Sequence, residues 1–310
     1  MALGDRVAMG RPQEAVPGGV LGILASQRLL RRVRLGATYG LLVVGAFFVV
    51  IPFFWMISSS LKEPLDVLKF PPEWIPDPVV WRNYYDALTQ DIAPFAVFFR
   101  NSALITATAL IGQVVSASVV AYSFARLRWW GRDVLFLVVL ATMMLPHQVT
   151  MIPVFVLFKS LHWLDTFKPL IVPAYFGGGA FYVFLMRQFM MTISLEIDDA
   201  AKVDGCNTLG LYRHIILPLS KPALGAAAIF SFQGHWNDFL GPLIYLNSMH
   251  KYTVQLGLAQ LRGYGSGAFG TPKLNLMMAA ATLVMLPCLL LFFFAQRQFI
   301  QGVVITGVKG

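Results

Sequence analysis

Long apolar runs separated by polar segments dominate the sequence. Each run approaches the length of about 20 residues that a helix needs to cross about 30 Å of hydrocarbon. In lipid the backbone amides must pair within their own segment, which favours helices. The pattern therefore predicts an all-α integral membrane protein with six transmembrane helices, the fifth being the weakest because Asp238 interrupts it. They run from Ala37 to Ile57, Ser102 to Ala125, Val134 to Phe158, Leu170 to Met186, Ala223 to Leu246 and Leu276 to Ala295.

The composition agrees with this interpretation. Of the 310 residues 57% are hydrophobic and 13% charged, against about 25% charged in a typical soluble domain. A net charge of +9 would suggest a nucleic-acid partner in a soluble protein, but here the basic residues fall between the apolar runs. We therefore expect lipid, and no nucleic acid, as the surrounding partner.

The basic residues also predict the orientation. With both termini in the cytoplasm, fifteen of the 24 lysines and arginines lie inside, as the positive-inside rule requires. Residues 1–36 and 301–310 are then cytoplasmic tails around a membrane domain of residues 37–300. No cleaved signal peptide is expected, because the first apolar run begins only near Ala37 and no small-residue cleavage site follows it.

Two external segments are predicted. Residues 58–101 combine prolines with tryptophans and tyrosines, which suits an ordered segment resting at the membrane interface. Residues 247–275 are rich in glycine, so their backbone can bend into unusual conformations. Composition leaves open whether this second segment inserts into a partner or is a plain connector.

The polar segment 194–222 carries the strongest functional signal. Ser194 is a candidate N-cap for a helix that ends at the turn Asp204-Gly205. Asn207 or Thr208 can cap a second helix through Leu217, which Pro218 is expected to stop. A bare connector needs neither an exposed small-residue face nor an apolar face, so two such helices indicate a docking element for a cytoplasmic partner.

This segment resembles the EAA loop, of the form E-A-A-x3-G-x9-I-x-L-P, of permease subunits of binding-protein-dependent ABC importers. The spacing agrees at every position, and the one departure is an aspartate in place of the family's glutamate. The matching run is Asp199-Ala200-Ala201, Gly205, Ile215 and Leu217-Pro218. The resemblance points to the maltose-type, MalG-like branch of carbohydrate permeases. Further similar runs are Ser60-Leu61-Lys62 with Pro71-Pro72, Asn101-Ser102, Ala121 to Arg126, Trp236 to Phe239 with Pro242-Leu243, and Gly307 to Gly310.

The resemblance implies a type I ABC importer permease fold in a bacterial inner membrane. It also implies a second, MalF-like permease, two copies of an ATPase and an extracytoplasmic solute-binding protein as partners. The chain contains no G-x-x-x-x-G-K-[ST] phosphate loop, so we expect it to bind no cofactor directly, with ATP and Mg on the ATPase subunit. Closure of the ATPase pair would move the EAA helices and switch the pathway by alternating access to a sugar or sugar-like solute.

Four groups of candidate residues follow. Those expected to couple to the ATPase are Asp199, Ala200, Ala201, Asp204, Gly205, Ile215, Leu217 and Pro218. The tail residues Gly307, Lys309 and Gly310 are expected at the same interface. Candidates for binding-protein contact are Tyr264, Gly265 and Gly267. Candidates for the solute path are Trp236, Asn237 and Asp238, although helix packing explains the first two equally well and a structural role is favoured for Asp238.

Other polar features favour structural roles. Pro146, followed by His147, predicts a kink in span three, and Gly177–Gly179 predict close packing or a hinge in span four. The histidines show no metal-ligand spacing, so no metal site is expected. The alternative function is an unrelated secondary transporter or channel, for which the paired broken spans or inverted repeats are not seen. An intramembrane enzyme would need a convergent catalytic set, which is also not seen.

Overall fold

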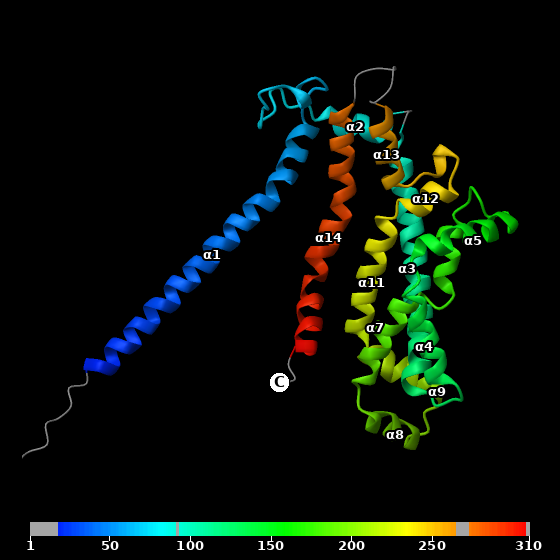
Figure 1. The fold of residues 1–310 in the computed structure, drawn as a ribbon. Helices are drawn as coiled ribbons and strands as arrows, with labels where there is room; N and C mark the ends of the chain where they lie inside the picture. The colour runs from blue at the N-terminus through cyan, green and yellow to red at the C-terminus, as the bar shows by residue number, and fades with distance from the viewer. Residues whose placement is uncertain (1–17, 91–92, 265–272, 308–310) are drawn as a thin grey trace, which may run out of the picture. The chain divides into compact units, whose positions relative to one another are not determined.

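The computed structural model describes residues 18–90, 93–264 and 273–307, in which every regular element is a helix. The chain divides into two units, residues 1–55 and 56–310, which are described separately. Figure 1 shows the helices. Their bounds are α1 Gly18–Ser60, η1 Asp66–Leu68, α2 Arg82–Thr89, α3 Phe95–Arg126, α4 Arg132–Thr142, α5 His147–Ser160, α6 Lys168–Ile171, η2 Val172–Tyr175, α7 Ala180–Met191, α8 Leu195–Val203, α9 Thr208–Leu211, η3 Tyr212–Ile216, α10 Leu217–Leu219, α11 Lys221–Trp236, α12 Leu240–Tyr245, η4 Met249–Lys251, α13 Val254–Tyr264 and α14 Leu274–Gly307.

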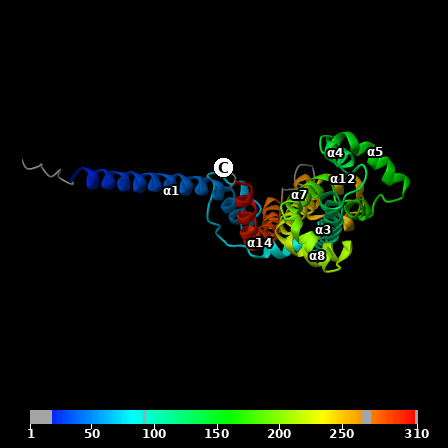
Figure 2. The ribbon, with the colours of Figure 1, turned by 90° about the horizontal axis from the view of Figure 1, so that it is seen from below.

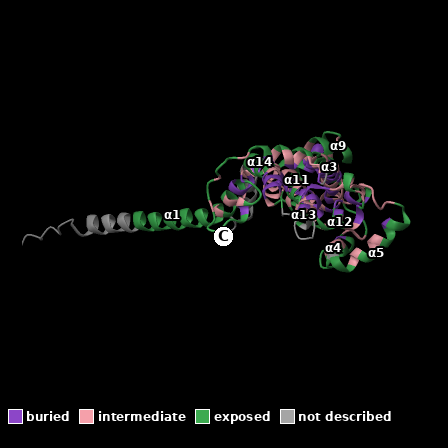
Figure 3. Cartoon of the chain, turned by 90° about the horizontal axis from the view of Figure 1, so that it is seen from above, coloured by how far each residue is buried: buried purple, intermediate pink, exposed green. Residues whose placement is uncertain are grey.

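The first unit contains most of α1. Its described side chains between Arg31 and Val50 are all exposed, and most of them are large and apolar (Figure 3). Such a surface is unfavourable in water but suits a helix surrounded by lipid or by another membrane helix. The expected first span is therefore present as a helix.

The second unit is built around α3. This helix packs against α7, α11 and α13, and Figure 2 shows α3 and α7 gathered with α8. Small residues on α3 allow the close approach that helix packing in lipid requires. At Gly112, for example, a Cβ atom would lie 2.4 Å from the Tyr175 ring.

Four helical stretches among the described residues are long and apolar enough to cross a membrane, and the third of them comprises α6, η2 and α7. They are Arg31–Ser60, Phe95–Arg126, Lys168–Met191 and Leu274–Gln296. A fifth is added if Thr208–Leu219 and Lys221–Trp236, bent by 75° at their junction, count as one span. The expected count of six is thus not reached by helix length and composition, and it stays a prediction.

The third predicted span, Val134 to Phe158, is wrong as a single helix. It is divided into α4 and α5 by a break between Thr142 and His147. Pro146 accounts for the break, because it offers no amide hydrogen and disfavours a helical conformation at the residue before it. The proline therefore interrupts the helix rather than bending it gently.

The fourth and fifth predicted spans are interrupted as well. Gly177, Gly178 and Gly179 all have positive φ and separate η2 from α7. A Cβ atom on Gly178 would lie 2.4 Å from the backbone oxygen of Gln113, so the expected close packing is present together with a break. In the fifth span, α11 ends at Trp236 and Asp238 accepts a hydrogen bond of 3.0 Å from the Gly241 amide at the start of α12.

The two predicted external segments are ordered where they are described. In segment 58–101, Asn83 donates to the backbone oxygens of Ser60 and Lys62 and accepts from Asn275 on α14. Segment 247–275 is not a plain loop: residues 254–264 form α13, whose Val254 is fully buried. Its glycine-rich part lies largely outside the described residues.

A polar clamp joins the α5–α6 connection to the segment after α12. Asp165 accepts hydrogen bonds from Lys251 at 2.8 Å and from the Ser248 hydroxyl at 2.6 Å. These bonds, that from Lys251 first, hold the pKa of Asp165 well below its ordinary value. Asn101 of α3 anchors the same region through the backbone oxygens of His250 and Tyr252.

Candidate functional site

The first helix of the EAA-like segment has the ends that the sequence predicts. The Ser194 hydroxyl accepts a hydrogen bond from the Glu196 amide and caps α8. At the other end the Gly205 amide donates a hydrogen bond to the Lys202 backbone oxygen, and the Cys206 amide donates one to the Ala201 backbone oxygen. Together with φ of +80° at Gly205, these two bonds form a Schellman motif.

The two faces of α8 differ sharply. Asp198 and Ala201 are buried against the rest of the second unit, whereas Asp199 and Ala200 are exposed. Val203 is 87% exposed, which is costly in water for a branched apolar side chain on a short helix. One face of α8 is therefore fixed to this chain and the other is free to receive a partner.

The second helix of the segment differs in part from the expectation. Asn207 provides the N-cap, because its side chain accepts a 2.7 Å hydrogen bond from the Gly210 amide. The helix continues through a π-helical turn, η3, and Pro218 does not stop it: α10 extends to Leu219. The wider π turn accommodates a residue that cannot donate a backbone bond. The chain bends only at Ser220, before α11 begins.

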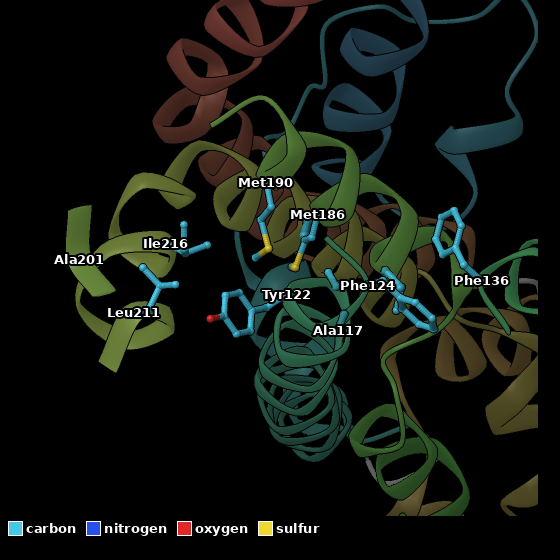
Figure 4. Packing of buried hydrophobic residues seen from close by; sticks show 12 residues of the cluster. Ala117, Tyr122, Phe124, Phe136, Met186, Met190, Ala201, Leu211 and Ile216 are labelled. Atoms are coloured by element: carbon cyan, nitrogen blue, oxygen red, sulfur yellow. The ribbon is translucent and has the colours of Figure 1, made fainter. Parts of the chain in front are cut away.

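Both short helices pack on the ends of α3 and α7. Tyr122 of α3 donates to the Thr208 backbone oxygen at 3.0 Å, and Ser118 bonds the Tyr212 hydroxyl at 2.7 Å. Ile216 is fully buried. Figure 4 shows Ile216, Leu211 and Ala201 approaching Tyr122 and Met190 from one side. This apolar contact joins the segment to α3 over a continuous surface.

A buried ion pair completes this junction. Arg126 at the end of α3 lies 3.4 Å from the Asp198 carboxylate, with the two side chains 1% and 5% exposed. Arg126 also donates to the backbone oxygens of Met190 and Ile193 after α7, at 2.6 and 2.8 Å. One guanidinium thus ties together α3, the end of α7 and α8. Sequence reasoning placed Arg126 in a motif but did not identify its partner, and the adjacent carboxylates Asp198 and Asp199 were the available signal.

The remaining predicted coupling residues lie on or beside the exposed face. Asp204, Gly205 and Pro218 are exposed, while Ile215 and Leu217 are half-buried. Asp199 pairs with Lys202 at 3.1 Å on the surface. The structure therefore brings these residues to one end of the second unit, and their contact with a partner stays a prediction.

The solute-path candidates separate into different roles. Trp236 is buried, donates to the Val284 backbone oxygen at 3.1 Å and stacks on Phe232, so it belongs to the packing of α11 against α14. The Asn237 side chain donates a hydrogen bond to the Gln233 backbone oxygen and accepts one from the Gln255 side chain. Asp238 lines a cavity of about 560 Å³ together with Gln113 and His235. Sequence reasoning named neither of these two residues as a site residue.

The other candidates lie mostly outside the described residues. This applies to Gly265 and Gly267 and to Lys309 and Gly310. Tyr264 is the last residue of α13 and Gly307 the last of α14, which places their backbones in helices. Contact of these positions with a binding protein or an ATPase stays a prediction.

Comparison with known proteins identifies the family. Residues 113–305 match the family described as "Binding-protein-dependent transport system inner membrane component". The arabinooligosaccharides transport system permease protein AraQ of Halalkalibacterium halodurans is 32% identical, over 86% of this chain and 93% of its own length. The sn-glycerol-3-phosphate transport system permease protein UgpE of Pectobacterium atrosepticum is 29% identical, over 85% of this chain and 94% of its own length.

Solved structures show the same fold. A bacterial ABC transporter involved in the import of the acidic polysaccharide alginate contains a chain with a TM-score of 0.75 and 21% identity, covering 88% of this chain and 97% of its own. A second alginate transporter structure, in complex with a pentasaccharide-bound periplasmic protein, has a TM-score of 0.60 and 14% identity, covering 87% and 94%. The family match and the extent of the AraQ similarity show that this chain belongs to the inner-membrane components of binding-protein-dependent transport systems and is a permease subunit of an ABC importer, not an enzyme.

Proposed function

We propose that this subunit forms half of the membrane pathway for a carbohydrate and that α8 to α10 receive a separate ATPase. The observation that carries the proposal is the division of α8 into two faces. Its buried face is held by Arg126 and Asp198, and its exposed face carries Asp199, Ala200 and Val203. A helix fixed rigidly on one side transmits movement applied to its other side, as alternating access requires.

The carbohydrate assignment is supported by the names of several relatives. These include the AraQ protein and the polygalacturonan/rhamnogalacturonan transport system permease protein YtcP of Bacillus subtilis, which is 30% identical over 88% of this chain. The same proposal includes coupling to the ATPase by the residues that match the EAA pattern. It also places the tail Gly307 to Gly310 near the interface with the ATPase. ATP and Mg would bind the ATPase, so the chain itself needs no cofactor.

The proposed assembly contains a second permease, two ATPase copies and an extracytoplasmic solute-binding protein. A solved transporter of this fold is in complex with a periplasmic protein, which supports the last partner. The residues around Tyr264 are the proposed contact for that protein. Both chain termini would lie in the cytoplasm, in agreement with the distribution of basic residues.

The proposal is tested by placing a photo-crosslinking amino acid at Val203 in the complete complex. Irradiation is expected to join this subunit to the ATPase, because Val203 is the most exposed apolar position on α8. The control position is Phe70, which is 92% exposed and belongs to segment 58–101. Figure 1 shows this segment, between α1 and α2, at the end of the second unit away from α8. An ATPase adduct from Phe70, or none from Val203, would contradict the proposed docking surface.

A further inference from the structure

Two interrupted helices line the cavity that contains Asp238, together with α3 and α5. One wall comes from the break at Gly178 and Gly179 before α7, and another from the break between α11 and α12. Interrupted helices are typical of transporter binding sites, because a broken helix exposes polar backbone where lipid is excluded. The lining residues are Gln113, Val154, Phe158, Pro169, Leu170, Pro173, Ala174, Gly178, Gly179, His235, Asp238, Gly241, Ile244 and Tyr245.

Gln113 organises the polar side of this cavity. Its amide nitrogen donates to the Gly178 backbone oxygen at 2.8 Å, which fixes the orientation of the amide. Its amide oxygen accepts from the Ser231 hydroxyl at 2.6 Å and lies 3.1 Å from His235 Nε2. Since that oxygen can only accept, His235 carries a hydrogen on Nε2. The network links α3 to both interrupted helices.

The network leaves hydrogen-bonding capacity unused. Among the described contacts, Asp238 uses Oδ1 for the Gly241 amide, and His235 uses only Nε2. Asp238 Oδ2 and His235 Nδ1 thus remain as acceptors. Phe158 and Tyr245 add aromatic surface beside these acceptors, with ring centroids 5.3 Å apart. Acceptors for hydroxyl groups next to aromatic faces suit a sugar ring.

The charge of the lining restricts the class of sugar. Asp238 is an acidic residue, and the lining contains neither lysine nor arginine. Proteins commonly bind carboxylates and phosphates through arginine or lysine. An anionic solute would instead meet the Asp238 carboxylate, whose like charge repels it. A neutral solute faces no such repulsion.

We propose that this cavity contacts the transported solute and that the solute is a neutral carbohydrate, not a uronate or a phosphate ester. The volume of about 560 Å³ lies within the usual range of about 300–1,000 Å³ for small-molecule sites. The inference rests on the proposed function, since it concerns the solute that the complete importer carries. It adds Gln113 and His235 to Asp238, already a solute-path candidate, as solute-contacting or solute-positioning residues.

The test uses the complete importer, with its binding protein, in proteoliposomes containing ATP. Uptake is measured for four labelled probes, arabinotriose, maltotriose, trigalacturonate and sn-glycerol 3-phosphate. Wild-type complex is expected to take up a neutral probe and neither anionic one. Gln113→Ala is expected to raise the KM for the neutral probe about tenfold, and Asp238→Asn, which keeps an oxygen for the Gly241 amide, about threefold or more.

Three controls make the outcome decisive. His235→Gln is expected to retain more uptake than His235→Ala, because an amide can still donate to Gln113. Thr108→Val alters a half-buried hydroxyl elsewhere on α3 and is expected to leave KM unchanged, because that hydroxyl bonds only within its own helix. Crosslinking from Val203 is recorded in parallel and reports on ATPase docking alone.

Each contrary result would overturn a defined part of the proposal. Uptake of an anionic probe at a rate similar to that of a neutral one would refute the neutral class. An unchanged KM in both Gln113→Ala and Asp238→Asn would refute contact in this cavity. Uptake of none of the four probes would refute the carbohydrate assignment and this inference with it, while the Val203 adduct would still show whether the ATPase docks.

Discussion

At the scale of single residues, Gly205 shows how local backbone geometry defines the end of α8. Its φ of +80° lies in the left-handed region, which residues with a Cβ rarely adopt. Apart from Gly205 itself and its two chain neighbours, no residue has an atom within 4 Å of the place where a Cβ would sit. A substitution there meets no steric obstacle from neighbours, so its whole cost is backbone conformation.

Gly205→Val is therefore expected to lower transport by displacing the end of α8, at a conformational cost of about 1–2 kcal/mol. Gly205→Asn should retain much more activity, because asparagine tolerates positive φ. Uptake and ATP hydrolysis are compared in complexes with equal amounts of each subunit in the membrane. Equal uptake by wild type and Gly205→Val would show that this cap does not contribute to coupling.

At the scale of elements, Arg126 and Asp198 decide how α8 is held. A surface pair such as Asp199–Lys202 contributes about 0–1 kcal/mol because water screens it. A buried pair behaves differently: removing one partner leaves an uncompensated charge and costs about 3–5 kcal/mol, whereas replacing both by apolar groups can be neutral. Arg126 additionally satisfies two backbone oxygens after α7, so its loss affects two elements.

Asp198→Asn is expected to lower the apparent midpoint of thermal unfolding of the purified complex and to raise proteolysis in segment 194–222. Asp199→Asn is the matched control, since it neutralises the neighbouring but exposed carboxylate; when all variants are compared in permease subunits freed of the ATPase, it should leave both measurements unchanged. The double variant Arg126→Met/Asp198→Leu should be more stable than Arg126→Met alone. If the two aspartate variants behaved alike, the buried pair would not hold α8.

At the scale of the whole molecule, the second unit has two distinct ends joined by α3. Arg126 at one end of α3 pairs with Asp198 of α8 in segment 194–222, the coupling segment of the proposed function, and Asn101 near the other end donates to the backbone oxygens of His250 and Tyr252. Figure 1 shows α8 and α13 at these opposite ends. The coupling segment and segment 247–275 are therefore expected on opposite sides of the membrane.

Cysteine labelling tests this orientation in a variant that lacks Cys206 and Cys288. Met249→Cys, at a side chain 36% exposed, should react with an impermeant maleimide in intact cells. Trp130→Cys lies on the α3–α4 turn, where the tryptophan is 98% exposed, and should react only after permeabilisation. The reverse labelling pattern would place the termini outside and overturn the proposed topology.

Local features of the coupling segment followed from the sequence alone. The caps of Ser194 and Asn207 and the glycine turn depend on residues a few positions apart, so short-range chemistry predicts them. The all-helical membrane fold followed from apolar runs for the same reason. The spacing of the EAA-like motif then indicated the family before any contact was known.

Tertiary structure decided everything that depends on distant partners. The Arg126–Asp198 pair, the Gln113–His235 contact across 122 positions and the packing role of Trp236 all join separate helices. A hydropathy pattern scores each segment by itself, so it neither pairs such residues nor detects that breaks in two spans face the same cavity. The sequence by itself determined that the long apolar runs are largely helical and which polar segment resembles a docking element, whereas the cavity and the buried ion pair exist only because α3 brings distant segments together.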